Sequence, residues 1–146
     1  MDPYSHPFAS EESIDRANRI YQKLTQFIPD LLTFQQGIKF EVEGYFAPIC
    51  LNVLDSSEGY RCIQLSHCWT DDAGDHIPDP DIVISMYPDW ELAEARIHKD
   101  NFSIEVAYPV KGGPVDMTVH QTINTFLERW LDALLSKENV RRISAA

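Results

Sequence analysis

The feature that most constrains the fold is a stripe of large apolar side chains near the C-terminal end of the sequence. Its members recur at spacings of three and four residues, which places them on one face of an α-helix. Asp116 or Thr118 can cap the first turn by accepting a backbone N–H hydrogen bond. The spacing predicts a helix over residues 117–136 that anchors the core through Val119, Ile123, Phe126, Leu127, Trp130, Leu131, Leu134 and Leu135.

A second apolar stripe lies near the N-terminal end. Ser10 can cap a helix whose first turn carries two glutamates, and negative charge suits the positive end of a helix. Pro29 ends the pattern. The sequence therefore predicts a helix over residues 11–28, with one face formed by Ile14, Ala17, Tyr21, Leu24 and Ile28.

Between the two helices, apolar residues alternate with polar ones from Gly37 onward, which is typical of half-exposed strands. Because strands that follow each other in sequence usually pair, we expect an antiparallel meander of five to six strands. Both helices are apolar on one side only, so the fold class is α+β, a two-layer sandwich with the N-terminal and C-terminal helices on one face of the sheet. The strands are expected near residues 38–42, 49–53, 60–69, 82–86, 92–97 and 102–108.

The length of 146 residues fits a single domain over residues 1–146. We expect residues 1–9 to form an irregular N-terminal arm and residues 138–146 to form a frayed tail. The sequence lacks a secretory signal and a long apolar run, and its 3 cysteines, an odd number, favour reduced thiols. These features predict a cytoplasmic protein.

The charge balance narrows the choice of partner. The chain has 12 Lys and Arg against 23 Asp and Glu, which gives a net charge of −11. This charge opposes nonspecific binding to nucleic acid or to an anionic membrane. It is compatible with a protein that mimics nucleic acid and binds a basic protein, although the acids gather in loops more than along helix faces.

Two patches of the sequence are similar to a known family. They are Ile-Val-Ile-Ser-Met-Tyr-Pro-Asp at 82–89 with Leu-Ala-Glu-Ala at 92–95, and His-Gln at 120–121 with Asn124, Phe-Leu at 126–127 and Trp-Leu at 130–131. In these residues the sequence resembles the YqiB-like family of small proteobacterial proteins, a domain of unknown function. The resemblance covers residues 14–135 approximately and implies the fold, and the family has no established activity to carry over.

An acidic segment, residues 71–81, contains carboxylates and an imidazole, which are metal ligands. Asp71, Asp75 and His76 would be the ligands of any divalent ion. The third position of a calcium-binding loop is occupied by Ala73, however, and no glutamate closes the loop. We therefore expect a mobile, solvent-facing loop without metal, and a small-ligand or divalent-metal-binding domain is the alternative.

The candidate partner surface combines a helix patch with aromatic residues near strand ends. His120 and Asn124 lie one helical turn apart, so they could contact a ligand together or tie the helix start to its neighbours. Five aromatics near strand ends could line a groove or a protein interface, or simply form the rim of a half-open sheet. They are Tyr45, Trp69, Tyr87, Trp90 and Tyr108. The predicted surface comprises His120, Gln121, Asn124, Tyr87, Trp90 and Trp69.

No sequence motif indicates catalysis: a Gly-rich phosphate loop, GxSxG, CxxC and HExxH are all missing. His67 and Cys68 are neighbours in a predicted strand, so their side chains should point to opposite faces. We therefore predict no catalytic residue and no cofactor, and favour a non-enzymatic protein-interaction or regulatory domain with an unidentified protein partner. An open second sheet face that carries Cys50, Leu54 and Cys62 also suggests a homodimer.

Overall fold

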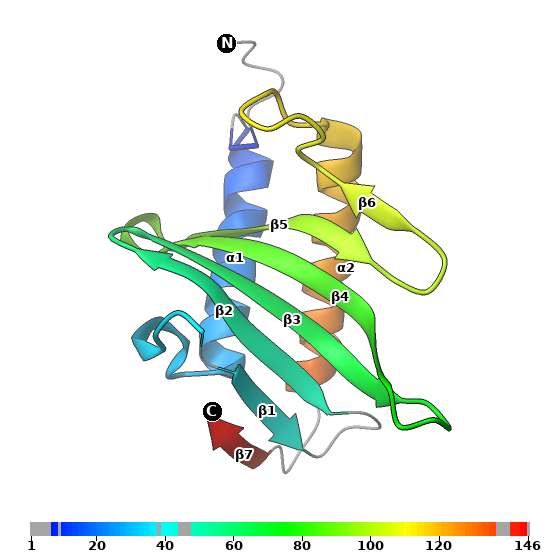
Figure 1. Ribbon diagram of the computed structural model, residues 1–146. Coiled ribbons are helices and arrows are strands. Elements are labelled where there is room, and N and C mark those ends of the chain that lie inside the picture. The colour runs from blue at the N-terminus through cyan, green and yellow to red at the C-terminus, as the bar shows by residue number, and fades with distance from the viewer. Residues whose placement is uncertain (1–6, 9, 38, 44–47, 137–140, 146) are drawn as a thin grey trace.

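The computed structural model describes residues 7–8, 10–37, 39–43, 48–136 and 141–145, with the backbone alone described for 39–43, 76 and 141–145. A single antiparallel sheet has the strand order β6-β5-β4-β3-β2-β1-β7 (Figure 1). The strands are β1 Lys39–Glu43, β2 Ile49–Ser57, β3 Tyr60–Thr70, β4 His76–Tyr87, β5 Leu92–Lys99, β6 Ile104–Val106 and β7 Arg141–Ala145.

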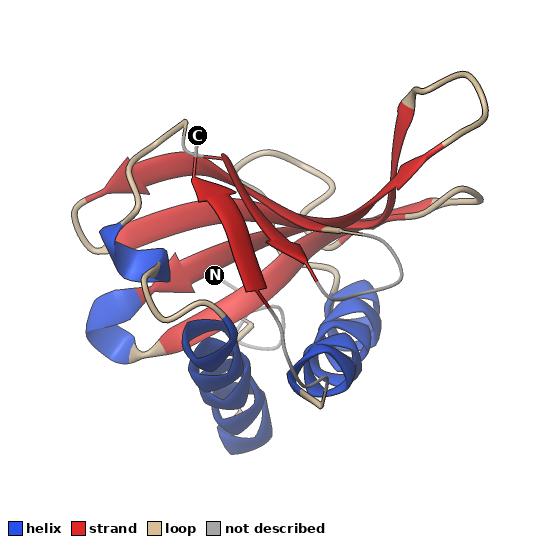
Figure 2. Ribbon diagram, turned by 90° about the horizontal axis from the view of Figure 1, so that it is seen from below, coloured by secondary structure: helices blue, strands red, loops and turns tan. Residues whose placement is uncertain are grey.

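Both long helices lie on the same side of the sheet, as Figure 2 shows. They are α1 Glu11–Phe27 and α2 Met117–Leu135. Two short 3-10 helices complete the fold. η2 Leu31–Thr33 lies between α1 and β1, and η3 Pro88–Trp90 lies between β4 and β5. The predicted α+β sandwich, with an antiparallel sheet and an N-terminal and a C-terminal helix on one face, is confirmed.

The core fills the space between the helices and one sheet face. Alternation along the central strands sends every second side chain toward the helices, where the apolar stripes of α1 and α2 meet them. Each buried aliphatic side chain of this kind contributes roughly 1.5–3 kcal/mol before the entropy cost. The fully buried members include Ile20, Leu24, Ile49, Leu51, Ile63, Leu65, Ile82, Ile84, Met86 and Ile123.

The two helices are parallel neighbours joined by charged side chains. The Glu128 carboxylate on α2 accepts hydrogen bonds from Arg19 Nε at 2.7 Å and from Lys23 Nζ at 2.8 Å, both on α1. Lys23 also pairs with Asp132 at 2.9 Å. Each helix start is capped as expected, by the Ser10 hydroxyl on α1 and by the Asp116 carboxylate on α2.

The C-terminal segment differs from the prediction. Residues 141–145, expected in a frayed tail, instead form β7, which pairs antiparallel with β1. The sheet therefore has seven strands, whereas we expected five to six. The reason is that β1 offers a free edge whose backbone groups a further strand can satisfy. Of the expected irregular arm at residues 1–9, only residues 7–8 are described.

The acidic segment also differs from the prediction. The connection between β3 and β4 is a tight turn, and β4 already begins at His76. Pairs such as Cys68↔Pro78 and Ser66↔Asp81 place residues 76–81 in the sheet. The expectation of a solvent-facing loop over residues 71–81 is therefore wrong for residues 76–81. Extended pairing with β3 outweighs the prolines that weaken a strand pattern.

Candidate functional site: a buried glutamate behind an arginine-lined groove

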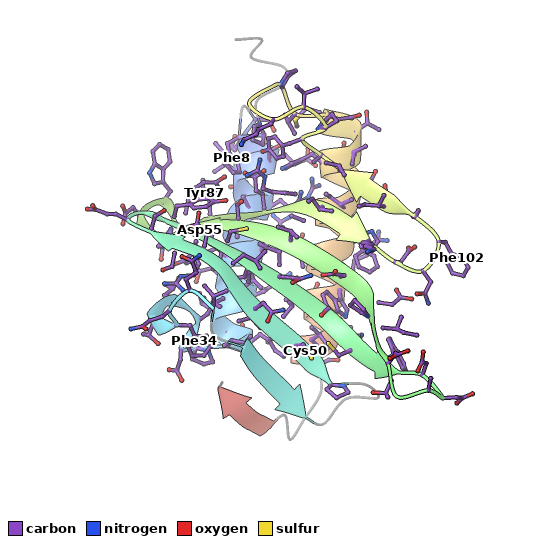
Figure 3. The ribbon with its side chains drawn as sticks, viewed as in Figure 1. Phe8, Phe34, Cys50, Asp55, Tyr87 and Phe102 are labelled. Atoms are coloured by element: carbon purple, nitrogen blue, oxygen red, sulfur yellow. The ribbon has the colours of Figure 1, made fainter. Side chains whose placement is uncertain are left out.

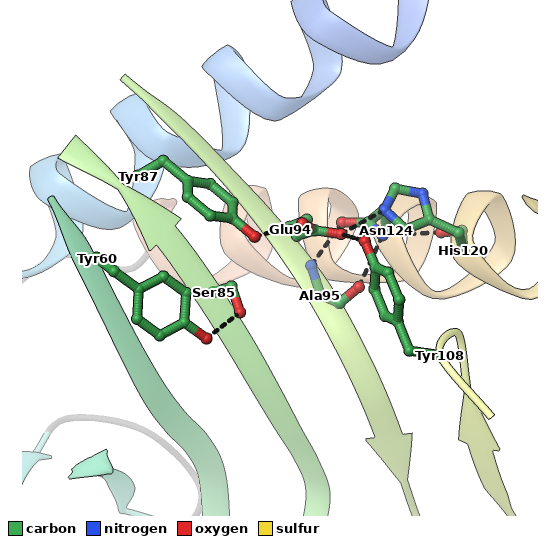
Figure 4. A network of polar contacts seen from close by, with 8 residues as sticks. All are labelled: Tyr60, Ser85, Tyr87, Glu94, Ala95, Tyr108, His120 and Asn124. Carbon is green, nitrogen blue, oxygen red and sulfur yellow. Dashed lines mark hydrogen bonds and ion pairs between the residues drawn. The ribbon is translucent and has the colours of Figure 1, made fainter. Parts of the chain in front are cut away.

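A buried carboxylate joins polar side chains from β4, from α2 and from the segment after β6. Glu94 on β5 is 1 % exposed. Its oxygens lie 3.0 Å from His120 Nε2 and 2.8 Å from the Tyr87 hydroxyl. The Tyr108 hydroxyl also donates to this carboxylate, so three side chains from different parts of the fold converge on it (Figure 4).

Local folding explains this convergence. The pair Ser85↔Glu94 places Tyr87, two residues along β4, on the same side of the sheet as Glu94. Beyond β6 the chain continues to pair with β5, because the Ala107 N–H donates to the Arg96 carbonyl at 2.9 Å. The Asp116 N–H then donates to the Ala107 carbonyl at 2.7 Å, which fixes the start of α2, and hence its first turns, beside β5.

The hydrogen bonds keep this carboxylate ionised although it is buried. Burial alone would raise the pKa of Glu94, but hydrogen bonds from His120, Tyr108 and Tyr87 outweigh burial and lower it. Burial and the neighbouring charge of Glu94 raise the pKa of both tyrosines well above the usual value. The tyrosines therefore act as neutral donors, and His120 Nε2 donates to an oxygen that can only accept.

The Asn124 side chain forms hydrogen bonds with a part of β5 that the short strand β6 does not pair with. Strand β6 pairs with residues 97–99 only. The Asn124 side chain, 2 % exposed, accepts from the Ala95 N–H at 2.7 Å and donates to the Ala95 carbonyl at 3.0 Å. The amide thereby supplies the donor and the acceptor that a neighbouring strand would otherwise provide.

Arg96 lies on the other side of Tyr108. The register changes between Val83↔Ile97 and Ile84↔Ala95, so Arg96 is the extra residue of a β-bulge, a feature that re-aims a side chain. Its guanidinium carbon lies 4.1 Å from the centroid of the Tyr108 ring. Tyr108 therefore donates its hydroxyl to Glu94 and contacts the Arg96 guanidinium with one face of its ring.

Arg96 and Tyr108 line a groove, which we call the Arg96 groove. One part, of about 190 Å³, is lined by Cys62, Val83, Arg96, Ile97, Val106 and Tyr108. The adjoining part, of about 580 Å³, is lined by Arg96, Tyr108 and the segment 109–113, which includes Lys111. The groove opens on the helix-free face, because Cys62 and Val83 alternate with core residues that point toward the helices.

The guanidinium of Arg96 has no salt bridge with any carboxylate of the described residues. Burial would lower the pKa of Arg96, but hydrogen bonding with Tyr60 and the charges of Tyr60 and Glu94 outweigh burial and raise it. The groove is thus lined by a half-buried permanent cation.

The residues predicted as a partner surface fall into separate places. His120, Asn124 and Tyr87 gather around β5 through Glu94 and Ala95. Gln121 is exposed and lines a shallow groove between the starts of the two helices. Trp90 is 77 % exposed on η3. Trp69 lies toward the opposite end of β4 from Tyr87, and its ring N–H donates to the Asp79 carbonyl at 2.8 Å.

Glu94 and Arg96 were not among the predicted site residues. Tyr108 was expected only as one of five aromatics that could line a groove, of which Tyr45 is outside the described residues. A signal was present in the sequence, because a glutamate and an arginine interrupt the otherwise apolar run of the strand predicted over residues 92–97. A charged residue inside such a run needs a partner when it is buried. That partner could not be identified from the spacing, because His120 is 26 residues away along the chain.

Two of the predicted metal ligands, Asp71 and Asp75, lie in the turn between β3 and β4. The Asp71 carboxylate accepts from the Ala73 and Asp75 N–H groups at 2.9 and 2.8 Å, so it stabilises the turn, and both aspartates are exposed. The His76 side chain is outside the described part of the chain. Asp81 is buried and accepts from Gln64 Nε2 at 2.9 Å on the helix-free face. Among the described residues, no group of three or more His, Cys, Asp or Glu could hold a metal ion.

The fold and the site define a small two-layer α+β domain with a polar network at one sheet edge and an arginine-lined groove on its open face. Among the described residues, neither α1, α2 nor any shorter helix has the length and hydrophobicity of a transmembrane span. The chain belongs to the DUF1249 family, described as protein of unknown function, whose model matches residues 23–140. Comparisons with curated proteins and with solved structures gave no match.

Proposed function

We propose that the chain is a non-enzymatic protein-interaction domain that binds its partner through the helix-free face of the sheet, at the Arg96 groove. The observation that carries this proposal is a half-buried guanidinium that lines a groove and has no salt-bridge partner among the described residues. Tyr60 and the charge of Glu94 already stabilise this cation, and a guanidinium without a salt bridge keeps N–H donors that a partner can use. Arginine and tyrosine are also the residues that most often dominate binding energy at interfaces.

The surroundings of the groove support binding more than catalysis. The titratable groups behind it are engaged with each other, because Glu94 accepts from His120 and from both tyrosines. The two helices cover the other face of the sheet (Figure 2). On the helix-free face, Val83 is partly exposed and Leu54 is exposed.

Two further properties belong to this proposal. The YqiB-like resemblance of residues 82–95 and 120–131 supports a proteobacterial protein of that type within the family. The three cysteines form no disulfide and lie as thiols on or near the helix-free face, where Figure 3 labels Cys50. Cysteines in the thiol form favour a reducing cytoplasm. With a net charge of −11, the partner is a protein and neither nucleic acid nor a membrane surface.

A quantitative capture experiment tests the proposal. The tagged full chain, expressed in its native host, is compared with Val83→Glu, which places a carboxylate in the groove, and with Thr122→Glu on the exposed side of α2. Circular dichroism confirms that all three chains are folded. The proposal predicts a protein that the wild type and Thr122→Glu retain and Val83→Glu loses. Equal retention by all three chains would contradict it.

Self-association is the simplest form of such an interaction. The open sheet face with Leu54 exposed leads us to propose a homodimer that uses this face. Light scattering at micromolar concentration should give twice the mass of the 16.7 kDa chain, and Val83→Glu should restore that mass to one chain. A monomer at every concentration would exclude a second copy as the partner and leave a different protein.

A further inference from the structure

The lining of the Arg96 groove has a charge opposite to that of the whole chain. Among the residues that line its two parts, Arg96 and Lys111 are basic and none is acidic. The chain as a whole has 23 acidic against 12 basic residues. The charge of Glu94 acts on Arg96, but Glu94 accepts from the Tyr108 hydroxyl and does not line the groove. A groove lined by two cations and no anion, on a protein with this balance, matches a ligand that carries negative charge.

The geometry around Arg96 is suited to a carboxylate. A guanidinium offers a planar fork of N–H donors that matches the two oxygens of a carboxylate. Arg96 is already stacked on Tyr108, and Tyr108 is held in turn by its hydroxyl bond to Glu94. A side chain ordered before the ligand arrives loses less entropy on binding, so this arrangement favours affinity.

The net charge of the chain opposes an acidic ligand, but only at long range. At physiological ionic strength, charges more than about 8 Å apart at the surface are largely screened. A carboxylate in contact with the half-buried Arg96 is screened much less. The local attraction therefore outweighs the repulsion from acids spread over the rest of the surface.

The apolar part of the groove specifies what lies next to the carboxylate. Val83, Ile97 and Val106 line the groove beside Arg96, together with the ring of Tyr108. These side chains can cover one apolar or aromatic side chain of a ligand, which adds affinity through burial. A phosphate or another small free anion would leave this apolar part unused.

We propose that the Arg96 groove binds a carboxylate of a peptide segment of the partner protein, with a neighbouring apolar side chain of the segment on Val83, Ile97 and Val106. This inference rests on the proposed function, and it adds the chemistry of the bound segment. The carboxylate comes from an acidic side chain or from a chain end. Lys111 supplies the second positive charge at the outer part of the groove.

Nuclear magnetic resonance on the ¹⁵N-labelled full chain tests this inference with small probes. The probes are N-acetyl-phenylalanine, which has a terminal carboxylate, N-acetyl-aspartyl-phenylalanine amide, which has a side-chain carboxylate, and N-acetyl-phenylalanine amide, which has none. At least one carboxylate probe should shift the Arg96 Nε–H signal and the Gly113 amide signal in a saturable way, whereas the neutral amide should not. The carboxylate probe with the lower dissociation constant identifies the source of the carboxylate.

Three variants read by the Gly113 amide make the test specific. Arg96→Gln should raise the dissociation constant at least about tenfold, as expected for a charge-assisted hydrogen bond. Lys111→Gln, at an exposed position that cannot disturb folding, should raise it about two- to fivefold. Lys99→Gln, which removes an exposed charge on the same strand but outside the groove lining, is the matched control and should leave it unchanged.

Several results would overturn the inference. They are the absence of a saturable shift with both carboxylate probes, an equal shift with the neutral amide, a larger shift with inorganic phosphate at the same concentration, and an equal effect of Lys99→Gln. If the probes fail while Val83→Glu still loses a protein partner, the proposed function stands without this ligand chemistry. If the probes bind while no protein depends on Val83, the groove binds carboxylates and the proposed function is wrong.

Discussion

Replacing Asn124 with aspartate changes one side-chain group in the buried network and leaves its shape almost unchanged. In the wild type, the Asn124 amide accepts from the Ala95 N–H and donates to the Ala95 and His120 carbonyls. A carboxylate can still accept, but it cannot donate. The Ala95 carbonyl would then face a negative charge at a site that is 2 % exposed in the wild type.

The expected cost follows from these contacts. Leaving the buried Ala95 carbonyl without a donor costs about 1–3 kcal/mol. The introduced carboxyl must also either be buried charged or bind a proton, which adds a similar amount at neutral pH. We therefore expect Asn124→Asp to lower the free energy of unfolding by about 3 kcal/mol at pH 7.

The pH dependence has a definite sign. Burial and the Ala95 carbonyl both raise the folded-state pKa of the introduced carboxyl above its unfolded value of about 3.9. The protonated carboxyl can donate to Ala95, so the deficit relative to wild type is largest above the folded-state pKa. It should shrink as the pH falls through that pKa toward the unfolded value.

Urea denaturation followed by circular dichroism at about pH 7.5 and about pH 5 measures both effects, with the wild type measured alongside. Gln121→Glu is the matched control, because it makes the same amide-to-acid change at an exposed position of the same helix. The free energy of unfolding of that control should stay within about 0.5 kcal/mol of wild type at both pH values. A loss for Asn124→Asp no larger than the control's, or one that grows as the pH falls, would refute the role assigned to Asn124.

Other perturbations test the helix layer and the acidic turn. The pKa of Glu128 is lowered to about 2 by hydrogen bonds from Arg19 and Lys23, so Glu128→Gln should cost about 1–2 kcal/mol at pH 7 after allowance for partial exposure. In the wild type this contribution is present above about pH 4.5 and is lost as the pH falls toward about 2, which denaturation at a series of pH values would show. Trp130→Ala should cost about 3–5 kcal/mol in urea denaturation, and a loss below about 1 kcal/mol would mean that its ring contributes little to the core. In the double variant with Asn in place of Asp71 and Asp75, the free energy of unfolding should stay within about 0.5 kcal/mol of wild type, because Asn keeps the acceptor oxygen of the turn. Calorimetry that found metal binding by the wild type and its loss in this variant would contradict the absence of a metal site.

The helices could be predicted closely from the sequence because their signals are local. The predicted ranges 11–28 and 117–136 differ by one residue from Glu11–Phe27 and Met117–Leu135. Apolar spacing fixes the buried face, and a capping residue one position before the first turn fixes the start. These interactions all lie within a few residues, so no knowledge of the tertiary structure is needed.

The early start of β4 and the presence of β7 depend on pairing with distant strands. Prolines at positions 78 and 80 break the alternation that would identify a strand, yet residues 76–81 pair with β3. Strand β7 pairs with β1, about 100 residues earlier in the chain, and no local pattern indicates which edge is free. Such pairings are decided by tertiary structure.

The candidate site was half predictable for the same reason. The helical spacing of His120 and Asn124 predicts that they share one face of the helix, and in the structure both contact β5. It does not reveal that a buried Glu94 binds one while the backbone of Ala95 binds the other. The groove residues Arg96 and Tyr108 become neighbours only because a bulge and a short β6 bring them together.

A buried ionised carboxylate needs an explanation beyond stability. Desolvation of such a group largely cancels the energy of its hydrogen bonds, and apolar replacements of similar volume are often equally stable. The Glu94 network does have a geometric effect, because it fixes the Tyr108 hydroxyl and thereby the ring face on which Arg96 lies. His120 joins the same carboxylate to α2, and Asn124 joins α2 to the neighbouring Ala95 backbone, so the network connects the helix with the ring that lines the groove. The network is therefore better understood as the support of the Arg96 groove than as a source of folding energy.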